Sequence, residues 1–554
     1  MNPEDFSVIC PRCLPAFLVM LPLLVAGGCA PAGAPPVKAA AAASEPVAAP
    51  KPAAAAQAPG QASVPASASA AAPAPRAAAT ADIPKRPETI TFAPLSFEPP
   101  DAAKFRRVLP DGTVVYLAPS HEFPLINVSV TFKGGSSLDP ADVPGLASMT
   151  ARMIREGGTA KQPPAEFDET LDFLATEIGV SANETFTTAT MNCLKSNLDE
   201  SLTLFVDMLR TPGFDAGRLK TAQARSIEML KQRNDDASSI LSREWKRLVY
   251  GTNHFESAEP TDKTVAAITK ERLAEMHGKI YHPGNAIVAV SGDFEEQEML
   301  AKLAKAFTGW ERSAPAADPV APTAVLEPGL YHVPKKIPQG KVVMGSRSIV
   351  RDDPDAIPLL LLNEILGAGG FTSRLMQQVR SNEGLAYSVR SAVTPRVTYP
   401  GDFRAGFESK NATVALATKI VLDQIRKIRD ELVTEEELET AKQGMIETFP
   451  RQFESKPQML RVFVNDEWTK RPADFWRTFR QKLAAVTRED LQRVARKHLD
   501  PEKMAVLVVG DWEAIAPGDL EKRASMGEFF GGKVKHLPLR DPLTLEPLPA
   551  EEGK

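Results

Sequence analysis

The chain has 554 residues, and its 65 lysines and arginines nearly balance 70 aspartates and glutamates, giving a formal net charge of -5. This balance argues against a protein whose main function is to bind nucleic acid. With 43% hydrophobic and 24% charged residues, the composition is that of a globular protein. No apolar run reaches about 18 residues, so the sequence predicts no membrane-spanning helix.

Residues 1–28 are expected to be a signal peptide. The apolar run 14–25 is too short to cross a membrane but suits the core of such a leader. The run ends in Leu-Val-Ala-Gly-Gly before Cys29, which resembles the bacterial lipobox. That resemblance implies that Cys29 is lipidated. Because the next residue is Ala30 rather than aspartate, it also implies an outer-membrane lipoprotein with a body that is expected in the periplasm.

Two further segments are expected to lie outside any folded domain. Residues 29–85 are rich in Ala and Pro and contain no aromatic residue, so they have nothing to bury and predict an extended, disordered tether. Residues 538–554 are expected to be a flexible tail. The membrane is therefore expected to be contacted through the lipid alone.

The folded body is a duplicated unit. Residues 268–295 align without a gap to residues 486–513, with ten of the 28 positions identical. Both segments contain a Thr-x-Glu helix start, a proline, an apolar strand and a Gly-Asp-aromatic sequence. Repeats at this distance predict two homologous domains, 86–318 and 319–537.

In chain order, the first copy opens with strands. Residues 108–115 contain the Asp-Gly pair typical of a hairpin. Apolar and polar residues alternate over 126–132, which predicts a half-buried strand. A helix over 144–156 follows, with Asp142 as its N-cap and Gly157-Gly158 as its stop.

The second copy repeats this order of strand, acidic turn and helix. Helices are expected elsewhere in both copies, so the fold class is α+β, with helices packed on a mixed or antiparallel sheet in each domain. The further predicted elements are a strand at 342–349 and helices at 167–178, 197–209, 357–366 and 435–447.

Several motifs together resemble the M16 metallopeptidases, the relatives of insulinase, pitrilysin and mitochondrial processing peptidase. The resemblance covers nearly all of residues 86–530 and implies two tandem M16-type domains that form one half of a clamshell. It rests on the order strand, Gly-Ser, acidic turn, Pro-Gly-Leu-Ala, helix, Gly-Gly-Thr in the first copy, and on the segments 248–251, 281–285, 367–375 and 384–387.

The zinc motif of that family is missing. Active members carry HxxEH on the helix after Gly-Leu-Ala, where two histidines bind zinc and the glutamate activates water. Here these positions are Ser148, Ala151 and Arg152, and the family's third ligand falls at Met229. A slip of one residue would offer Glu228, but one carboxylate does not make a zinc site. The chain is therefore expected to bind no catalytic zinc or other cofactor.

The second copy keeps a different pair. In M16 enzymes the C-terminal half supplies an Arg and a Tyr that reach the substrate and the tetrahedral intermediate, and Arg380 and Tyr387 have the matching Arg-x6-Tyr spacing. A cation and a phenol donor aimed at a developing oxyanion stabilise it. The alternative is that Arg380 caps a helix and Tyr387 packs in a strand. The segment Gly367–Gly370 could be mistaken for a phosphate-binding loop. It follows a helix rather than a strand and lacks the lysine of such a loop, so the sequence does not predict nucleotide binding.

Two functions remain open. In the first, the chain is the non-catalytic subunit of an M16 heterodimer, and it contributes Arg380 and Tyr387 to a peptide or unfolded protein held at the zinc of an HxxEH-bearing partner. In the second, it is a non-enzymatic peptide-binding or scaffold lipoprotein, like the zinc-free M16-type core subunits of respiratory complexes. A homodimer stays an alternative to the heterodimer.

Overall fold

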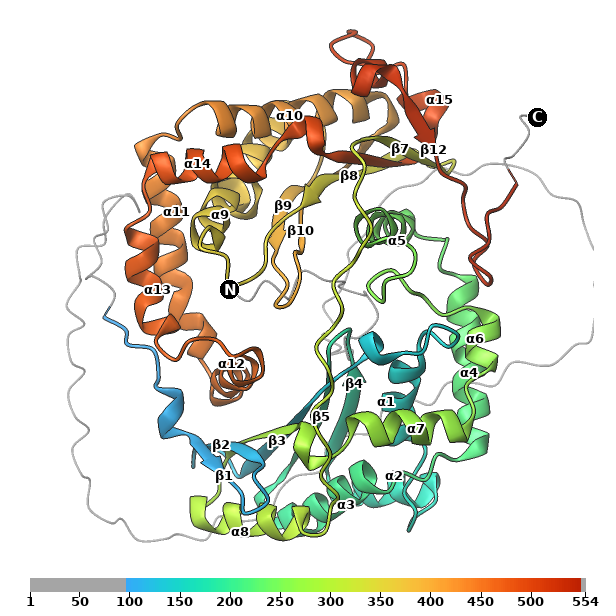
Figure 1. The fold of residues 1–554 in the computed structure, drawn as a ribbon, viewed down its shortest axis with the longest axis vertical. Helices are drawn as coiled ribbons and strands as arrows, with labels where there is room; N and C mark the ends of the chain where they lie inside the picture. Colours follow the sequence, from blue (N-terminus) through green and yellow to red (C-terminus); the bar gives the residue numbers. More distant parts are fainter. Residues whose placement is uncertain (1–95, 550–554) are drawn as a thin grey trace, which may run out of the picture. The chain divides into compact units, whose positions relative to one another are not determined.

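A computed structural model describes residues 96–549, so the predicted signal peptide, Cys29 and the tether lie outside the described residues. The described chain contains two six-stranded sheets, each accompanied by helices (Figure 1). None of its helices is both long and apolar enough to cross a membrane.

The first sheet has the strand order β1-β2-β6-β3-β5-β4. Only β2 and β6 run parallel, and every other neighbouring pair is antiparallel. The hairpin predicted around Asp111-Gly112 is confirmed, because β1 and β2 pair on either side of it. The strands are β1 (Arg106–Val108), β2 (Val114–Pro119), β3 (Leu125–Lys133), β4 (Glu177–Ala182), β5 (Phe186–Leu194) and β6 (Ala286–Gly292).

The second sheet repeats this arrangement in the order β12-β7-β11-β8-β10-β9. Val128 of β3 pairs with Val290 of β6, and Val342 of β8 pairs with Val508 of β11, so the repeated strands occupy matching places. The predicted duplication is thereby confirmed. The strands are β7 (Gly329–Pro334), β8 (Gln339–Arg347), β9 (Val389–Thr394), β10 (Asp402–Lys410), β11 (Ala505–Gly510) and β12 (Val534–His536).

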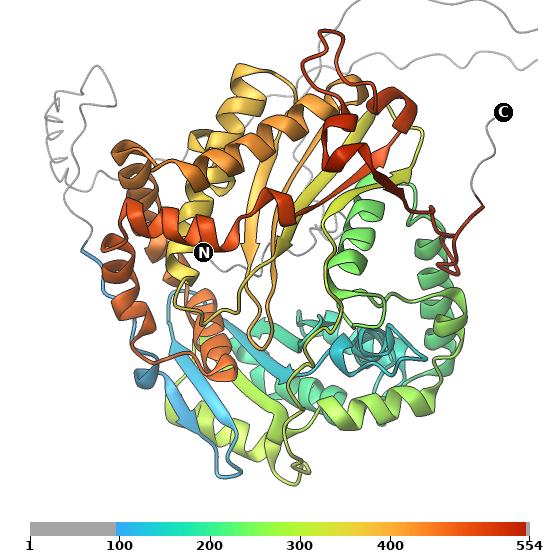
Figure 2. The same cartoon turned by 45° about the horizontal axis from the view of Figure 1, so that its top comes forward.

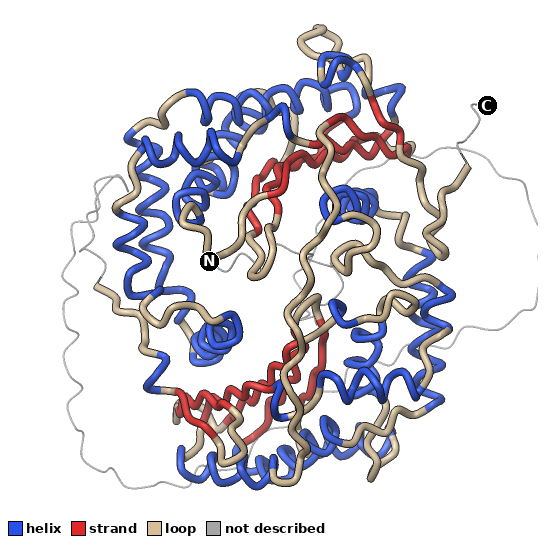
Figure 3. The backbone as a smooth tube through the Cα atoms, in the orientation of Figure 1, coloured by secondary structure: helices blue, strands red, loops and turns tan. Residues whose placement is uncertain are grey.

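The helices also recur in the two copies (Figure 3). Both predicted Thr-x-Glu starts are real, because Thr269 and Thr487 cap α7 and α14 through their hydroxyl oxygens. The helices are α1 (Leu146–Glu156), α2 (Pro164–Phe173), α3 (Leu198–Arg210), α4 (Ala216–Lys231), α5 (Ala237–Tyr250), α6 (Asp262–Ala266), α7 (Lys270–Ile280), α8 (Glu296–Phe307), α9 (Ala356–Asn363), α10 (Val414–Asp430), α11 (Glu435–Thr448), α12 (Lys456–Thr469), α13 (Phe475–Ala484), α14 (Arg488–His498) and α15 (Trp512–Ile515).

The two copies exchange one helix each. Helix α5 of the first copy packs on β8 and β11 of the second sheet (Figure 2), and α12 of the second copy packs on β2 and β6 of the first sheet. Trp245 on α5 is buried and donates a hydrogen bond to Asp402 at 2.8 Å. On α12, the Phe463 ring lies 5.8 Å from that of Tyr116. The core of the second copy therefore includes side chains of the first sheet, and a smaller cluster under α5 combines both copies.

The helix predicted over 167–178 is wrong at its C-terminal end. Helix α2 stops at Phe173, and residues 177–182 form the edge strand β4 instead. The backbone turns at Ala175, whose φ is 48°, and the amide of Thr176 donates back to Leu171. A residue in the left-handed conformation ends a helix, and that residue is usually glycine. Here it is Ala175, so nothing in the sequence indicated that the helix stops.

The predicted N-cap of the first long helix is also wrong. Asp142 forms an ion pair with Arg272 at 2.6 Å and does not cap α1. The amides at the start of α1 are bound by Asp139 instead. Its carboxylate accepts hydrogen bonds from the amides of Gly145 and Ala147, each at 2.7 Å. Burial raises the pKa of Asp139 to about 6, although these two hydrogen bonds oppose the shift.

The described part of the expected flexible tail, residues 538–549, is held in place. The Arg540 guanidinium pairs with Glu244 on α5 at 2.9 Å, and the amide of Asp262 donates to the carbonyl of Leu543. Leu537 and Leu539 pack against the cluster between α5 and the second sheet. This segment thus extends the second copy onto elements of the first.

Candidate functional site

The Gly-rich segment after α9 forms a rigid base in the second copy. Helix α9 continues into a π-helical turn, η7 (Glu364–Ala368), and a second π-helical turn, η9 (Met376–Asn382), follows. Such turns are rare and occur frequently at functional sites. Leu375 and Val379 are fully buried, and Arg374 forms two hydrogen bonds with Glu437 of α11 at 2.6 and 2.7 Å. Side chains carried by η9 therefore start from a fixed backbone.

Arg380 and Tyr387 are brought together at the surface. Gly384 adopts φ +63°, and the amide of Leu385 donates to the carbonyl of Val379, so the chain folds back at this point. The Arg380 guanidinium then lies 4.5 Å from the centre of the Tyr387 ring. Tyr387 is 83% exposed and thus does not pack within a strand, which was the alternative interpretation.

A third side chain completes this cluster. The Phe371 ring lies 4.7 Å from the Arg380 guanidinium and is 67% exposed. Arg380 therefore stacks between two exposed rings, a contact worth about 0.5–1 kcal/mol per ring at such sites. Among residues 96–549, no carboxylate forms an ion pair with it. We call Phe371, Arg380 and Tyr387 the Arg-Tyr cluster. Phe371 lies in a motif that the sequence singled out, but nothing in the sequence indicated its contact with Arg380.

The positions of the missing zinc motif lie on two helices that contact each other, α1 and α4. Ser148 is exposed, Ala151 is buried, and Arg152 pairs with Glu156 at 3.0 Å on the same helix. On α4, Met229 is exposed. The neighbouring Glu228 pairs with Lys231 at 2.6 Å. Since zinc sites need three or four N, O or S ligands, these side chains do not fit the metal.

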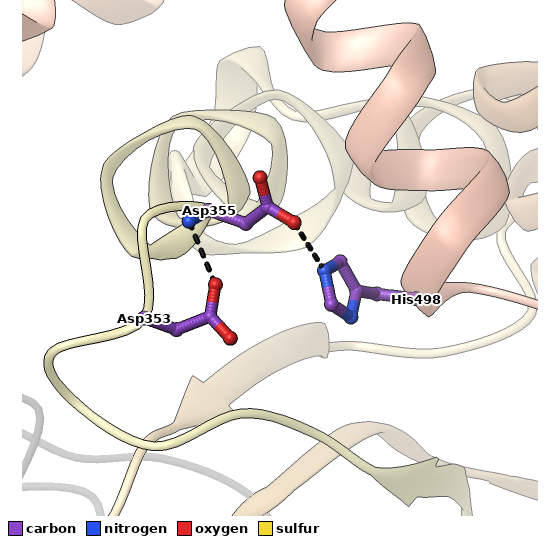
Figure 4. Close-up of side chains that lie close together, drawn as sticks. All are labelled: Asp353, Asp355 and His498. Atoms are coloured by element: carbon purple, nitrogen blue, oxygen red, sulfur yellow. Dashed lines mark hydrogen bonds and ion pairs between the residues drawn. The ribbon is translucent and has the colours of Figure 1, made fainter.

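One other group has the composition of a metal centre, namely Asp353, Asp355 and His498 (Figure 4). The buried Asp355 carboxylate pairs with His498 at 2.8 Å and also with Arg493 and Lys497, both at 2.7 Å. These cations already satisfy the carboxylate, and they would repel a metal ion. The group therefore ties α14 to the start of α9.

The electrostatics of this group support the same conclusion. Burial by itself raises the pKa of Asp355, but hydrogen bonds from Lys497, His498 and Arg493 outweigh it and hold that pKa well below its usual range. The amide of Asp355 donates to Asp353 at 2.8 Å, which fixes the turn before α9. Asp355 is thus a structural carboxylate.

Comparison with family models identifies two regions of the chain. Residues 114–255 match the model described as Insulinase (Peptidase family M16), and residues 267–445 match the one described as Peptidase M16 inactive domain. A Helicobacter pylori protein named as the non-peptidase homolog YmxG is 24% identical over 401 residues, which cover 71% of this chain and 90% of that protein. An uncharacterized zinc protease of Streptomyces coelicolor is 26% identical over 291 residues, covering 51% and 62%.

Solved structures share the fold. A Pseudomonas fluorescens peptidase M16 inactive domain superposes with a TM-score of 0.66 at 24% identity and covers 73% of this chain and 98% of its own. A Helicobacter pylori protease superposes with a TM-score of 0.65 at 19% identity, covering 75% and 100%. Together with the two family matches, this confirms the predicted α+β architecture of two tandem domains.

Proposed function

We propose that this chain, which carries two M16-type domains in tandem, is the zinc-free subunit of a two-chain peptidase. In this proposal it contributes Arg380 and Tyr387 to a peptide held at the zinc of a partner that has the HxxEH motif. The observation that carries the proposal is the Arg-Tyr cluster, whose two rings are exposed on a rigid base around a partly buried Arg380, although every zinc-ligand position is substituted.

The chain lacks the ligand set of a catalytic zinc. Ser148, Ala151, Arg152 and Met229 cannot bind zinc together, so nothing at this place activates a water molecule. Arg152 would also place a positive charge where the metal belongs. The name of the Helicobacter pylori relative, a non-peptidase homolog, agrees with this part of the proposal.

The chain instead supplies two hydrogen-bond donors, Arg380 and Tyr387. Peptide hydrolysis passes through a tetrahedral intermediate with a negative oxygen, and preorganised donors stabilise that charge. The Tyr387 hydroxyl and the Arg380 guanidinium are both donors. Because the guanidinium has only ring partners among the described residues, a substrate need not displace a carboxylate to reach it.

Reconstitution tests this function. We expect the purified chain to hold no stoichiometric zinc and to cleave no peptide. Mixed with an HxxEH-bearing M16 chain of the same organism, it should form a complex and raise that chain's turnover of unfolded peptides. About one tightly bound zinc per chain, or full activity of the partner alone, would contradict the proposal. Complex formation without any gain in turnover would instead favour a peptide-binding or scaffold lipoprotein.

The location is part of the same proposal. We propose that the lipobox-like sequence ending at Cys29 attaches the chain to the outer membrane, with the body in the periplasm. The support is the sequence pattern alone, since Cys29 lies outside the described residues. An Ala/Pro-rich tether of residues 29–85 would give the body room to reach a partner.

A further inference from the structure

A pocket of about 140 Å³ lies in the second copy, among α9, β9, α11 and α13. None of the three residues of the Arg-Tyr cluster lines it. Most of its wall is apolar, with Leu360 on α9, Met445 on α11 and Phe479 on α13 among the lining side chains. A largely apolar cavity with a few polar groups is the usual form of a small-molecule or side-chain binding site.

Glu364 is the distinctive polar group of this pocket. Glu364 is one of the residues that line the pocket, and no hydrogen bond or ion pair of its carboxylate occurs within residues 96–549. Burial raises the pKa of Glu364. The two other charged lining residues each form an ion pair, Arg351 with Asp352 at 2.7 Å and Arg471 with Asp466 at 3.0 Å. A ligand that enters the pocket therefore meets one uncompensated carboxylate.

The aromatic wall of the pocket suits a cation. Phe449 and Phe479 stack with ring centres 5.6 Å apart, and Trp476 packs against both. The rings of Phe475 and Trp476 already accept the Arg471 guanidinium, at 4.2 and 5.0 Å from their centres. Ring faces attract cations, and the attraction grows as water is removed.

We propose that this pocket binds a primary ammonium group carried on an apolar body, with Glu364 accepting hydrogen bonds from the ammonium and the aromatic wall covering the body. An anionic ligand is disfavoured, because both arginines of the lining are paired and Glu364 would repel it. The same chemistry occurs in a free alkylamine and in a lysine side chain of a bound peptide. The site does not depend on a zinc-bearing partner.

Calorimetric titration of the full chain in detergent tests this site with hexylammonium chloride and with 1-hexanol, which has the same body without the charge. We expect hexylammonium to bind about tenfold or more tightly than hexanol, since the alcohol can donate a hydrogen bond to the half-buried carboxylate but lacks the positive charge that pairs with it. Nα-acetyl-lysine methylamide is the third probe. If it binds as well as hexylammonium, the natural group is a lysine side chain, and if it binds more weakly, a free amine is favoured.

Variants locate the binding. Glu364→Gln should remove the preference for hexylammonium over hexanol, and Leu360→Phe should weaken both probes by filling the pocket. Glu436→Gln, on the exposed face of α11, is the matched control and should change nothing. Equal binding of both probes, no binding of either, or an unchanged preference in Glu364→Gln would overturn the proposal. The comparison of the two probes on the unmodified chain needs no variant to fold.

Discussion

Arg380 differs from most arginines of this chain in the partners that hold it. Its guanidinium stacks between the rings of Phe371 and Tyr387, at 4.7 and 4.5 Å, while Arg374 in the same segment pairs with Glu437. Stacking keeps the charge near the surface without neutralising it. Arg374 therefore stabilises the fold, and Arg380 keeps the charge that the proposed function would use.

Tyr387→Phe should reduce the turnover of the reconstituted two-chain peptidase by about 10²–10³-fold, because the loss of one oxyanion donor commonly has that effect. Arg380→Ala should do the same, and both variants should assemble normally because both side chains lie outside the core. Peptide cleavage by the mixed chains measures the effect, and gel filtration checks assembly. Arg461→Ala, an exposed arginine on α12, is the control. Full activity in both test variants would leave the Arg-Tyr cluster without a catalytic role.

Asp355 makes a pH-dependent contribution to stability. Since its pKa in the folded chain lies below that of an unfolded aspartate, about 3.9, its contribution is present above that pH and is lost as the pH falls through the lower, folded value. Asp355→Asn should lower the free energy of unfolding by about 1–3 kcal/mol at neutral pH.

Urea unfolding of both proteins between pH 7 and pH 3 measures this contribution. The difference between wild type and Asp355→Asn should shrink toward the acid end. Asp474→Asn changes an exposed aspartate that forms no ion pair within residues 96–549, and it should be near neutral throughout. A difference that stays constant over the whole range would show that Asp355 does not titrate as its contacts indicate.

At the scale of elements, the C-terminal segment joins parts that are far apart in the sequence. Strand β12 pairs with β7, after which Leu537 and Leu539 join the cluster under α5. Arg540 then reaches the buried Glu244 of α5 at 2.9 Å, while Arg243 and Arg247 approach the same carboxylate at 3.6 and 3.9 Å. After β12, the segment is held by the Arg540–Glu244 ion pair, by the hydrogen bond from the Asp262 amide to Leu543 and by apolar packing.

Arg540→Ala should lower the free energy of unfolding by about 2–4 kcal/mol. Removing one partner leaves a buried charge short of its best contact, and the two more distant arginines offset only part of that loss. Lys535→Ala in the same segment is the matched control. Its ion pair with Glu327 is exposed, so the change should stay below about 1 kcal/mol. Chemical denaturation of both variants compares them, and equal effects would argue against a structural role for Arg540.

At the scale of the whole molecule, the exchanged helices make the two copies interdependent. Without α5, the second sheet would expose residues that pack against Trp245 and Val249, and without α12 the first sheet would expose Tyr116. Burial of such side chains contributes about 1.5–3 kcal/mol each. The described chain is therefore expected to unfold as one cooperative unit.

Membrane attachment should depend on one atom outside this unit, the sulfur of Cys29. We expect Cys29→Ser to release the chain from the outer-membrane fraction, because the proposed lipid chain would supply the anchoring energy. The melting temperature should stay unchanged, because an Ala/Pro-rich sequence without aromatic residues has little to bury. Cell fractionation and thermal melting measure the two effects. A Cys29→Ser protein that still sediments with the outer membrane would refute the lipobox interpretation.

The sequence by itself determined the features that local patterns encode. The aligned segments 268–295 and 486–513 established the duplication, and alternation over 126–132 identified a strand. The spacing of Arg380 and Tyr387 identified a pair that does lie together, although its catalytic role stays a prediction. Side-chain periodicity was enough for the strand and internal alignment for the duplication, whereas the pair was found through its resemblance to the M16 pattern.

Only the tertiary structure decided which distant groups meet. It showed that Asp139, and not Asp142, accepts the hydrogen bonds at the start of α1. It also showed that Phe371 contacts Arg380 in the Arg-Tyr cluster. It also placed Glu364, a single acid in an apolar helical run, in a pocket built by four elements. The pocket depends on packing between residues as far apart as Arg351 and Phe479, which burial of apolar surface settles only when the whole chain folds. Asp139 and Phe371 meet partners fewer than ten residues away, but through turns that local propensity does not encode.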